Sequence, residues 1–239
     1  LKDMVLSPKI TKSLKRILHE QSKLDLLREH NLKSRRKLLF TGPPGCGKTM
    51  SATVLAKELA VPLFIIRLDG LISRYMGESI SKLRLIFDAM HQFRAVYLFD
   101  EFDSIGTTRT SGNEVGEIKR VLNSFLLQIE KDDSGSLIIA ATNLPQFLDT
   151  ALFRRFDDII VYELPDKTEI REMYTLRLNE LDIYYRFDIE RIAHESIGLN
   201  YSDINRICED LAKDILVYGE EEISEDILIE NIRQRKKPF

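Results

Sequence analysis

The apolar residues of this chain fall into short runs separated by amphipathic stretches. Brief runs at 37–40, 63–66, 95–99, 137–141 and 159–162 are rich in β-branched and aromatic side chains and do not alternate with polar residues. Such segments are typical of strands buried on both faces of a parallel sheet. Amphipathic stretches of helix length, over about 49–60, 79–93 and 114–130, lie between them. The alternation predicts an α/β fold, a five-stranded parallel sheet with helices on both faces.

The pattern changes near Pro165 and Asp166, which mark a plausible domain boundary. After this point the strands stop and helical periodicity continues over 167–181, 188–196, 201–217 and 224–233. We therefore predict a large α/β domain over residues 1–164 and a small all-helical lid domain over residues 165–239.

Composition narrows the class of protein without naming a function. The 239 residues are 44% hydrophobic and 31% charged, which is ordinary for a soluble globular protein. No apolar run is long enough to span a membrane, and a net charge of −3 gives no overall attraction to nucleic acid. Cys46 and Cys208 lack metal-type spacing, so we expect reduced thiols in a cytoplasmic protein. Because the chain begins at Leu1, we expect that further sequence precedes it.

A glycine-rich loop follows the first predicted strand and precedes a predicted helix. Its sequence, GPPGCGKT, fits the phosphate-binding pattern G-x-x-x-x-G-K-[ST], called Walker A. The glycines let backbone N–H groups turn toward an anion, and the helix N-terminus favours negative charge. Lys48 would neutralise the β- and γ-phosphates of ATP, and the Thr49 hydroxyl would ligate Mg²⁺. The predicted nucleotide-binding residues here are Gly42, Pro43, Pro44, Gly45, Cys46, Gly47, Lys48, Thr49 and Met50.

Two further strand ends carry polar groups that ATP hydrolysis would need. The run VYLFDE ends in Asp100 and Glu101, the Walker B arrangement. Asp100 would hold Mg²⁺ through water, and Glu101 would act as general base toward the attacking water. Asn143 ends the run LIIAATN, where a neutral amide can orient the water or the γ-phosphate. A protein that only binds nucleotide would not need Glu101.

Together these segments resemble the AAA ATPases in the narrow sense, the clade of protein-remodelling motors. The resemblance covers about residues 38–203 and rests on GPPGCGKT, YMGES, LFDEFDSI, AATN, RRFD and GLNYSDI in the family's order. It extends to the ATPase modules of katanin, spastin and FtsH. It implies a ring, usually a hexamer of identical subunits, with ATP sites between neighbouring subunits.

The resemblance also assigns roles to residues that the chain's own chemistry leaves open. Arg154 and Arg155 would be arginine fingers that reach the γ-phosphate held by the neighbouring subunit. Several family members carry Pro-Gly before the last arginine, whereas this chain has the compact RRF form of the microtubule-severing and membrane-scission branch, so either arginine could be the principal finger. Tyr75 and Met76 would form a pore loop that grips an extended polypeptide through apolar contact and its backbone. Tyr201 and Ser202 stand where the family places small Gly-Ala near adenosine, and are predicted nucleotide contacts.

The resulting prediction is an Mg²⁺-dependent ATPase ring that unfolds, threads or remodels a protein substrate. A nucleic-acid-associated motor or loader is the alternative, although the acidic charge balance and the aromatic YMG loop make nucleic acid the less favoured partner. A membrane-type zinc protease would need H-E-x-x-H, and both HEQSK and HESIG lack the second histidine. A separate protease or adaptor could still act with the ring.

Overall fold

The computed structural model describes residues 4–68, 78–102, 112–148, 150–218 and 225–236. The chain divides into two compact units. The first contains Lys9–Gly42 and Lys48–Tyr162; the second contains Lys2–Pro8, Pro43–Gly47 and Glu163–Phe239. The predicted domain division at residue 164 stays a prediction. No helix in the described ranges is long and apolar enough to cross a membrane.

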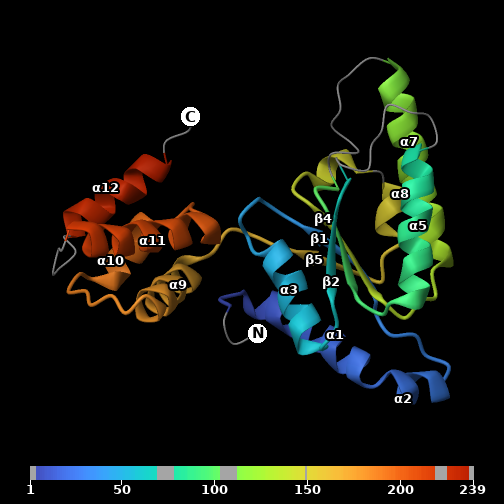
Figure 1. The fold of residues 1–239 in the computed structure, drawn as a ribbon. Helices are drawn as coiled ribbons and strands as arrows, with labels where there is room; N and C mark the ends of the chain where they lie inside the picture. The colour runs from blue at the N-terminus through green and yellow to red at the C-terminus, as the bar shows by residue number, and fades with distance from the viewer. Residues whose placement is uncertain (1–3, 69–77, 103–111, 149, 219–224, 237–239) are drawn as a thin grey trace. The chain divides into compact units, whose positions relative to one another are not determined.

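A five-stranded sheet is the centre of the first unit (Figure 1). Its strands pair in the order β2-β3-β4-β1-β5, all parallel. They are β1 (Lys37–Thr41), β2 (Leu63–Arg67), β3 (Val96–Asp100), β4 (Leu137–Thr142) and β5 (Asp158–Val161). Each lies within one residue of a predicted apolar run, so the predicted sheet is confirmed.

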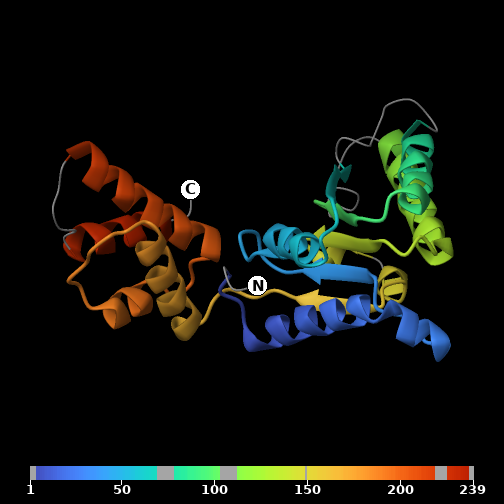
Figure 2. The ribbon, with the colours of Figure 1, turned by 60° about the horizontal axis from the view of Figure 1, so that its bottom comes forward.

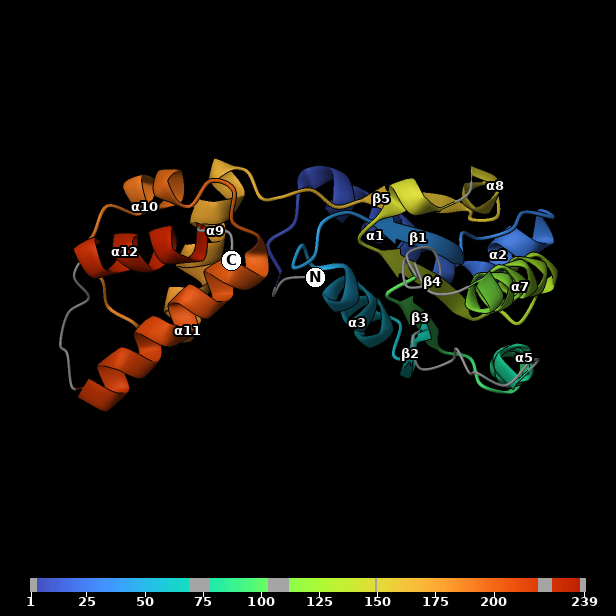
Figure 3. The same cartoon turned by 90° about the horizontal axis from the view of Figure 1, so that it is seen from above.

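Helices cover both faces of this sheet. Viewed from above (Figure 3), α3 (Lys48–Glu58) lies on one side of the strands, and α5 (Glu78–Gln92) and α7 (Gly112–Lys131) lie on the other. Phe87 of α5 and Phe125 of α7 pack in one buried cluster with Phe99 of β3. Because side chains alternate along a strand, Leu98 points to the opposite face and is equally buried. Among the residues that the structure describes, this unit also contains α1 (Pro8–Ser22), α2 (Leu24–Glu29), the 3-10 turn η1 (Pro145–Phe147) and α8 (Thr150–Phe153).

The two outermost strands are less buried than the sequence predicted. The apolar runs at 63–66 and 159–162 were interpreted as fully buried, but Ile65 of β2 is 52% exposed and Val161 of β5 is 45% exposed. The sheet order explains this, because β2 and β5 each have a neighbouring strand on one side only. An apolar run therefore predicted the strand correctly and its burial wrongly.

Four helices build the core of the second unit, shown in orange to red in Figure 2. They are α9 (Lys167–Glu180), α10 (Ile189–Glu195), α11 (Tyr201–Tyr218) and α12 (Glu225–Lys236). A capping box starts α9: Asp166 accepts the Glu169 N–H at 2.8 Å, and Glu169 accepts the Asp166 N–H at 3.0 Å. This pairing satisfies backbone donors that have no partner inside the helix. The helical region predicted after residue 164 is confirmed.

Candidate functional site

The predicted phosphate lysine lies at the carboxyl ends of the strands, which we call the carboxyl edge of the sheet. Lys48 is the first residue of α3 and is only 7% exposed. Its Nζ donates to the Gly42 carbonyl at 2.7 Å and to Asn143 Oδ1 at 2.8 Å. The structure therefore brings Lys48 and Asn143, two predicted site residues, into contact. Buried and surrounded by acceptors, this ammonium is held in one place, as binding of a phosphate requires.

The two predicted magnesium ligands also lie together at this edge. Thr49 Oγ1 donates to Asp100 Oδ2 at 2.9 Å, which joins the first turn of α3 to the end of β3. Hydroxyl and carboxylate oxygens, with water, are ligands that Mg²⁺ prefers. These two residues therefore fit the ion that the sequence predicted, and they do so beside Lys48.

Glu101 follows Asp100 in an unusual backbone conformation. Its φ is +54°, a left-handed value that is uncommon for a residue other than glycine. The turn is stabilised by the Glu101 N–H, which donates to Asp100 Oδ1 at 2.9 Å, and by the buried Phe102, whose N–H donates to Ala141 at 2.9 Å. Strained backbone of this kind is frequent at functional sites. The turn exposes the Glu101 carboxylate at the carboxyl edge.

Arg67 was not predicted as part of this group. It ends β2, where it is paired in register with Asp100, and its Nη2 lies 3.4 Å from Glu101 Oε2. There was little indication in the sequence that Arg67 belongs to the site, since a single arginine after LFII indicates only the end of a strand. Both side chains of this ion pair are largely exposed to solvent, so the pair is weak and the Glu101 carboxylate can separate from Arg67 at little cost in free energy.

Gly42 begins the phosphate-binding loop at a point of close backbone approach. A β-carbon on Gly42 would lie 2.0 Å from the Tyr162 carbonyl oxygen, and its φ is +138°. Tyr162 in turn donates its N–H to the Thr41 carbonyl at 2.7 Å. Glycine is therefore required here by the packing of β1 against the chain that leaves β5.

The middle of the loop, Pro43–Gly47, groups with the second unit. The Ser202 N–H, at the start of α11, donates to the Gly45 carbonyl at 3.2 Å. A β-carbon on Gly45 would lie 2.5 Å from Oδ1 of Asn200, and that oxygen accepts the Asp203 N–H at 2.8 Å. Ser202 thus meets the loop through its backbone. Asn200 was missed by sequence reasoning, although an asparagine three residues before Asp203 is a recognisable helix-start signal.

Tyr201 lies near the loop but its hydroxyl is engaged elsewhere. The hydroxyl donates to Glu169 Oε2 at 3.0 Å. Burial, reinforced by the negative charge of Glu169, raises the pKa of Tyr201 well above its ordinary value. Of the other predicted loop contacts, Cys46 is 1% exposed, with Sγ 3.7 Å from the Pro44 carbonyl, and Met50 is 52% exposed.

The two predicted arginine fingers lie away from this cluster. Arg154 and Arg155 precede β5, at the amino ends of the strands, which we call the amino edge. Both are exposed, and Arg155 forms an ion pair with Glu130 near the end of α7. A five-residue strand is roughly 16 Å long, so these arginines and Lys48 lie at opposite edges of one sheet. The predicted pore residues, Tyr75 and Met76, fall outside the described residues.

Comparison with known proteins agrees with this arrangement. Residues 38–164 match the model of the ATPase family associated with various cellular activities, AAA. An uncharacterized AAA family ATPase of Sinorhizobium fredii is 37% identical over 93% of this chain and 67% of its own length. Katanin p60 ATPase-containing subunit A1 of Strongylocentrotus purpuratus is 32% identical over 82% of this chain. The ATP-dependent zinc metalloprotease FtsH of Rhodothermus marinus is 33% identical over 73% of it.

These relatives are longer proteins, of which the chain spans 41% for the katanin subunit and 26% for FtsH. The family match covers all of the sheet except the first residue of β1, and it includes Lys48, Asp100 and Asn143 at the carboxyl edge. This chain therefore belongs to the AAA family of ATPases.

Proposed function

We propose that this ATPase works as a ring of identical subunits, a hexamer, and that each catalytic site is completed by arginines of the neighbouring subunit. ATP turnover in the ring would drive the remodelling, unfolding or threading of a protein substrate. Bound Mg²⁺ would neutralise charge on the phosphates during the reaction.

Each residue at the carboxyl edge has a role in this proposal. Lys48 binds the phosphates, while Thr49 and Asp100 hold the metal. Glu101 accepts a proton from the attacking water, after its carboxylate leaves Arg67, and Asn143 orients that water. The backbone N–H groups of Gly45, Cys46 and Gly47 surround the phosphates, and Tyr201 and Ser202 complete the nucleotide contacts.

The observation that carries the proposal is the separation of the arginines from the lysine. Arg154 and Arg155 lie at the amino edge, a full strand length from Lys48 and Asp100 of the same chain. They are exposed there, and too far away to stabilise charge at the subunit's own carboxyl edge. A second copy of the chain would bring such arginines to the first copy's phosphates. An arginine supplied by a partner is worth ~10³–10⁵ in rate in nucleotide hydrolysis.

Mixing two inactive variants tests the shared site. Lys48→Ala subunits lack the phosphate lysine but can supply arginines, and Arg154→Ala/Arg155→Ala subunits lack arginines but keep the lysine. Equal mixing should place complementary subunits together at about one interface in four and restore ATP turnover. Each variant alone should be nearly inactive. If the arginine-less variant alone matched the wild type, the arginines would not belong to the site.

The protein-substrate part of the proposal needs its own measurement. Turnover by the wild type should rise with an unfolded polypeptide, and Tyr75→Ala should abolish that rise while leaving ATP affinity intact. Salt-sensitive stimulation by DNA, with none by polypeptide, would instead support the nucleic-acid alternative.

A further inference from the structure

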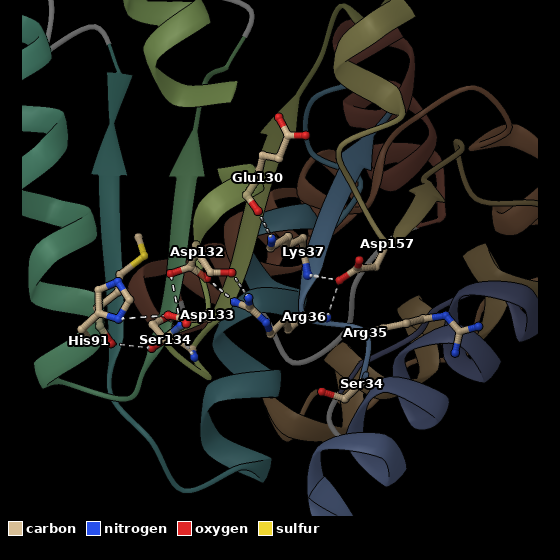
Figure 4. Close-up of polar contacts among 12 residues, drawn as sticks. Ser34, Arg35, Arg36, Lys37, His91, Glu130, Asp132, Asp133, Ser134 and Asp157 are labelled. Carbon is tan, nitrogen blue, oxygen red and sulfur yellow. Dashed lines mark hydrogen bonds and ion pairs between the residues drawn. The ribbon is translucent and has the colours of Figure 1, made fainter. Parts of the chain in front are cut away.

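Asp157 lies two residues after Arg155 and joins the arginine-bearing turn to the start of β1. Its Oδ2 accepts two backbone N–H groups, from Arg36 at 3.0 Å and from Lys37 at 2.9 Å (Figure 4). Its own N–H donates to the Lys37 carbonyl at 2.7 Å. One residue therefore makes three hydrogen bonds to Lys37, the first residue of β1, and to Arg36 just before it, which fixes its position relative to the start of β1.

The segment that Asp157 contacts is itself anchored. The Arg36 guanidinium contacts both the side chain and the carbonyl of Asp132, the residue after α7 (Figure 4). The Asp132 side chain is 0% exposed. The Arg36 carbonyl accepts the N–H of Ile138 in β4 at 2.7 Å. Asp157 is thus hydrogen-bonded to a segment that is itself bonded to Asp132, after α7, and to β4.

The arginines lie between two attachments of this turn. Before them, Leu152 is 0% exposed, packs in a buried cluster of the unit and accepts the Arg155 N–H at 3.0 Å. After them, Phe156 is 8% exposed and packs in the same cluster, and Asp157 makes the hydrogen bonds described above. The turn is therefore fixed by apolar packing at residues 152 and 156 and by hydrogen bonds at residue 157. The exposed parts of this turn include the two arginine side chains.

We propose that Asp157 is a positioning residue for Arg154 and Arg155, setting where they enter the neighbouring subunit's site. This inference rests on the shared site proposed above. Loss of the carboxylate would leave the N–H groups of Arg36 and Lys37 without this acceptor and would weaken the attachment of the turn on the side that follows the arginines. Since a displacement of about 1 Å can lower a rate by about 100-fold, we expect turnover at the neighbouring site to fall at least about tenfold.

The mixing experiment can locate the effect in one subunit type. Asp157→Ala is added either to the Lys48→Ala subunit, which supplies arginines, or to the Arg154→Ala/Arg155→Ala subunit, which supplies the lysine. The restored ATP turnover should fall about tenfold or more in the first mixture and stay near its original value in the second. A residue needed only for folding would lower both.

Two further changes in the arginine-supplying subunit serve as controls. Asp158→Ala removes the same charge one residue later, from a carboxylate that contacts Ile159 and Arg35, and should leave the restored turnover unchanged. Asp157→Asn keeps an oxygen that can accept both N–H groups and should recover most of the turnover lost in Asp157→Ala.

The outcomes separate the inference from the proposal on which it rests. If the two parent variants never restore turnover together, the proposal of a shared site is wrong, and so is the positioning role of Asp157 that rests on it. If they do restore turnover, but Asp157→Ala has no effect or the same effect in both subunits, only the positioning role is overturned.

Discussion

The buried ion pair between Arg36 and Asp132 should respond unequally to removal of its two partners. The Asp132 side chain is 0% exposed and the Arg36 side chain is 17% exposed. In Arg36→Ala, a fully buried carboxylate loses its cationic partner. In Asp132→Ala, the guanidinium keeps the carbonyl of residue 132 as an acceptor and still reaches water. The arginine variant should therefore be the less stable of the two.

The magnitudes follow from this difference in burial. Breaking a buried pair by removing one partner costs about 3–5 kcal/mol, and we place Arg36→Ala in that range for unfolding of the first unit. For Asp132→Ala we expect about 1–3 kcal/mol, the cost of a buried polar group that keeps part of its bonding. The double variant Arg36→Met/Asp132→Leu leaves no buried charge, so it should be more stable than Arg36→Ala.

Hydrogen exchange of strand amides measures these losses of stability in the first unit separately from the second. The Ile138 N–H, which donates to the Arg36 carbonyl, should report the free energy of opening of β1 and β4. Amides of α11 in the second unit serve as the internal control and should keep their protection. Equal destabilisation by the two single variants, or less than about 1 kcal/mol from Arg36→Ala, would refute the assignment of Asp132 as a buried charge.

Two other substitutions have directions that the structure fixes. Gly42→Ala should destabilise the first unit by more than about 3 kcal/mol, because its β-carbon would lie 2.0 Å from the Tyr162 carbonyl oxygen. As a control, Gly135→Ala should cost only about 1–2 kcal/mol, because Gly135 has a φ of +75° but nothing lies within 4 Å of its added β-carbon. Equal losses of stability for the two variants in denaturant titrations would contradict the close contact at Gly42. Tyr201→Phe should reduce alkaline sensitivity of the second unit. The folded-state pKa of Tyr201 is raised above 10.0, so the stability of the folded state is fully present below that pH and is lost as pH rises above it. Urea titrations on both sides of pH 10 should show a smaller loss in the variant, and an identical loss would mean that the Tyr201 hydroxyl ionises freely in the folded protein.

Local sequence predicted the strands and helices well because the pattern that identifies each of them lies within a few consecutive residues. The run Leu38–Phe40 and the loop from Gly42 to Thr49 are contiguous, so periodicity and glycine spacing were sufficient. The meeting of Lys48 with Asn143 was not predicted, but it could have been, because parallel strands place their carboxyl ends at one edge. The position of β2 and β5 at the two edges of the sheet was not predictable, because their sequences are as apolar as those of the interior strands.

Contacts between distant segments were beyond the reach of these patterns. Asp157 and the Arg36 N–H are 121 residues apart, and Asp132 and Arg36 are 96 apart. Neither aspartate belongs to a motif that states its partner. The same is true of Tyr201, whose bond to Glu169 uses a residue that also caps α9. Only the fold brings these pairs together.

The strand β1 connects the two edges that the proposed function uses. Its first residue, Lys37, is bonded through its backbone to Asp157 of the arginine-bearing turn, and its last residue, Thr41, leads into Gly42 and the phosphate-binding loop. The strand is paired on both sides, with β4 and β5, so its ends cannot shift independently of the sheet. A displacement at the loop would therefore be passed along roughly 16 Å of strand to the arginines that serve the next site. In a closed ring, that short path would let each subunit's phosphate contacts influence the arginines that it supplies to its neighbour's catalytic site, without a separate communicating domain.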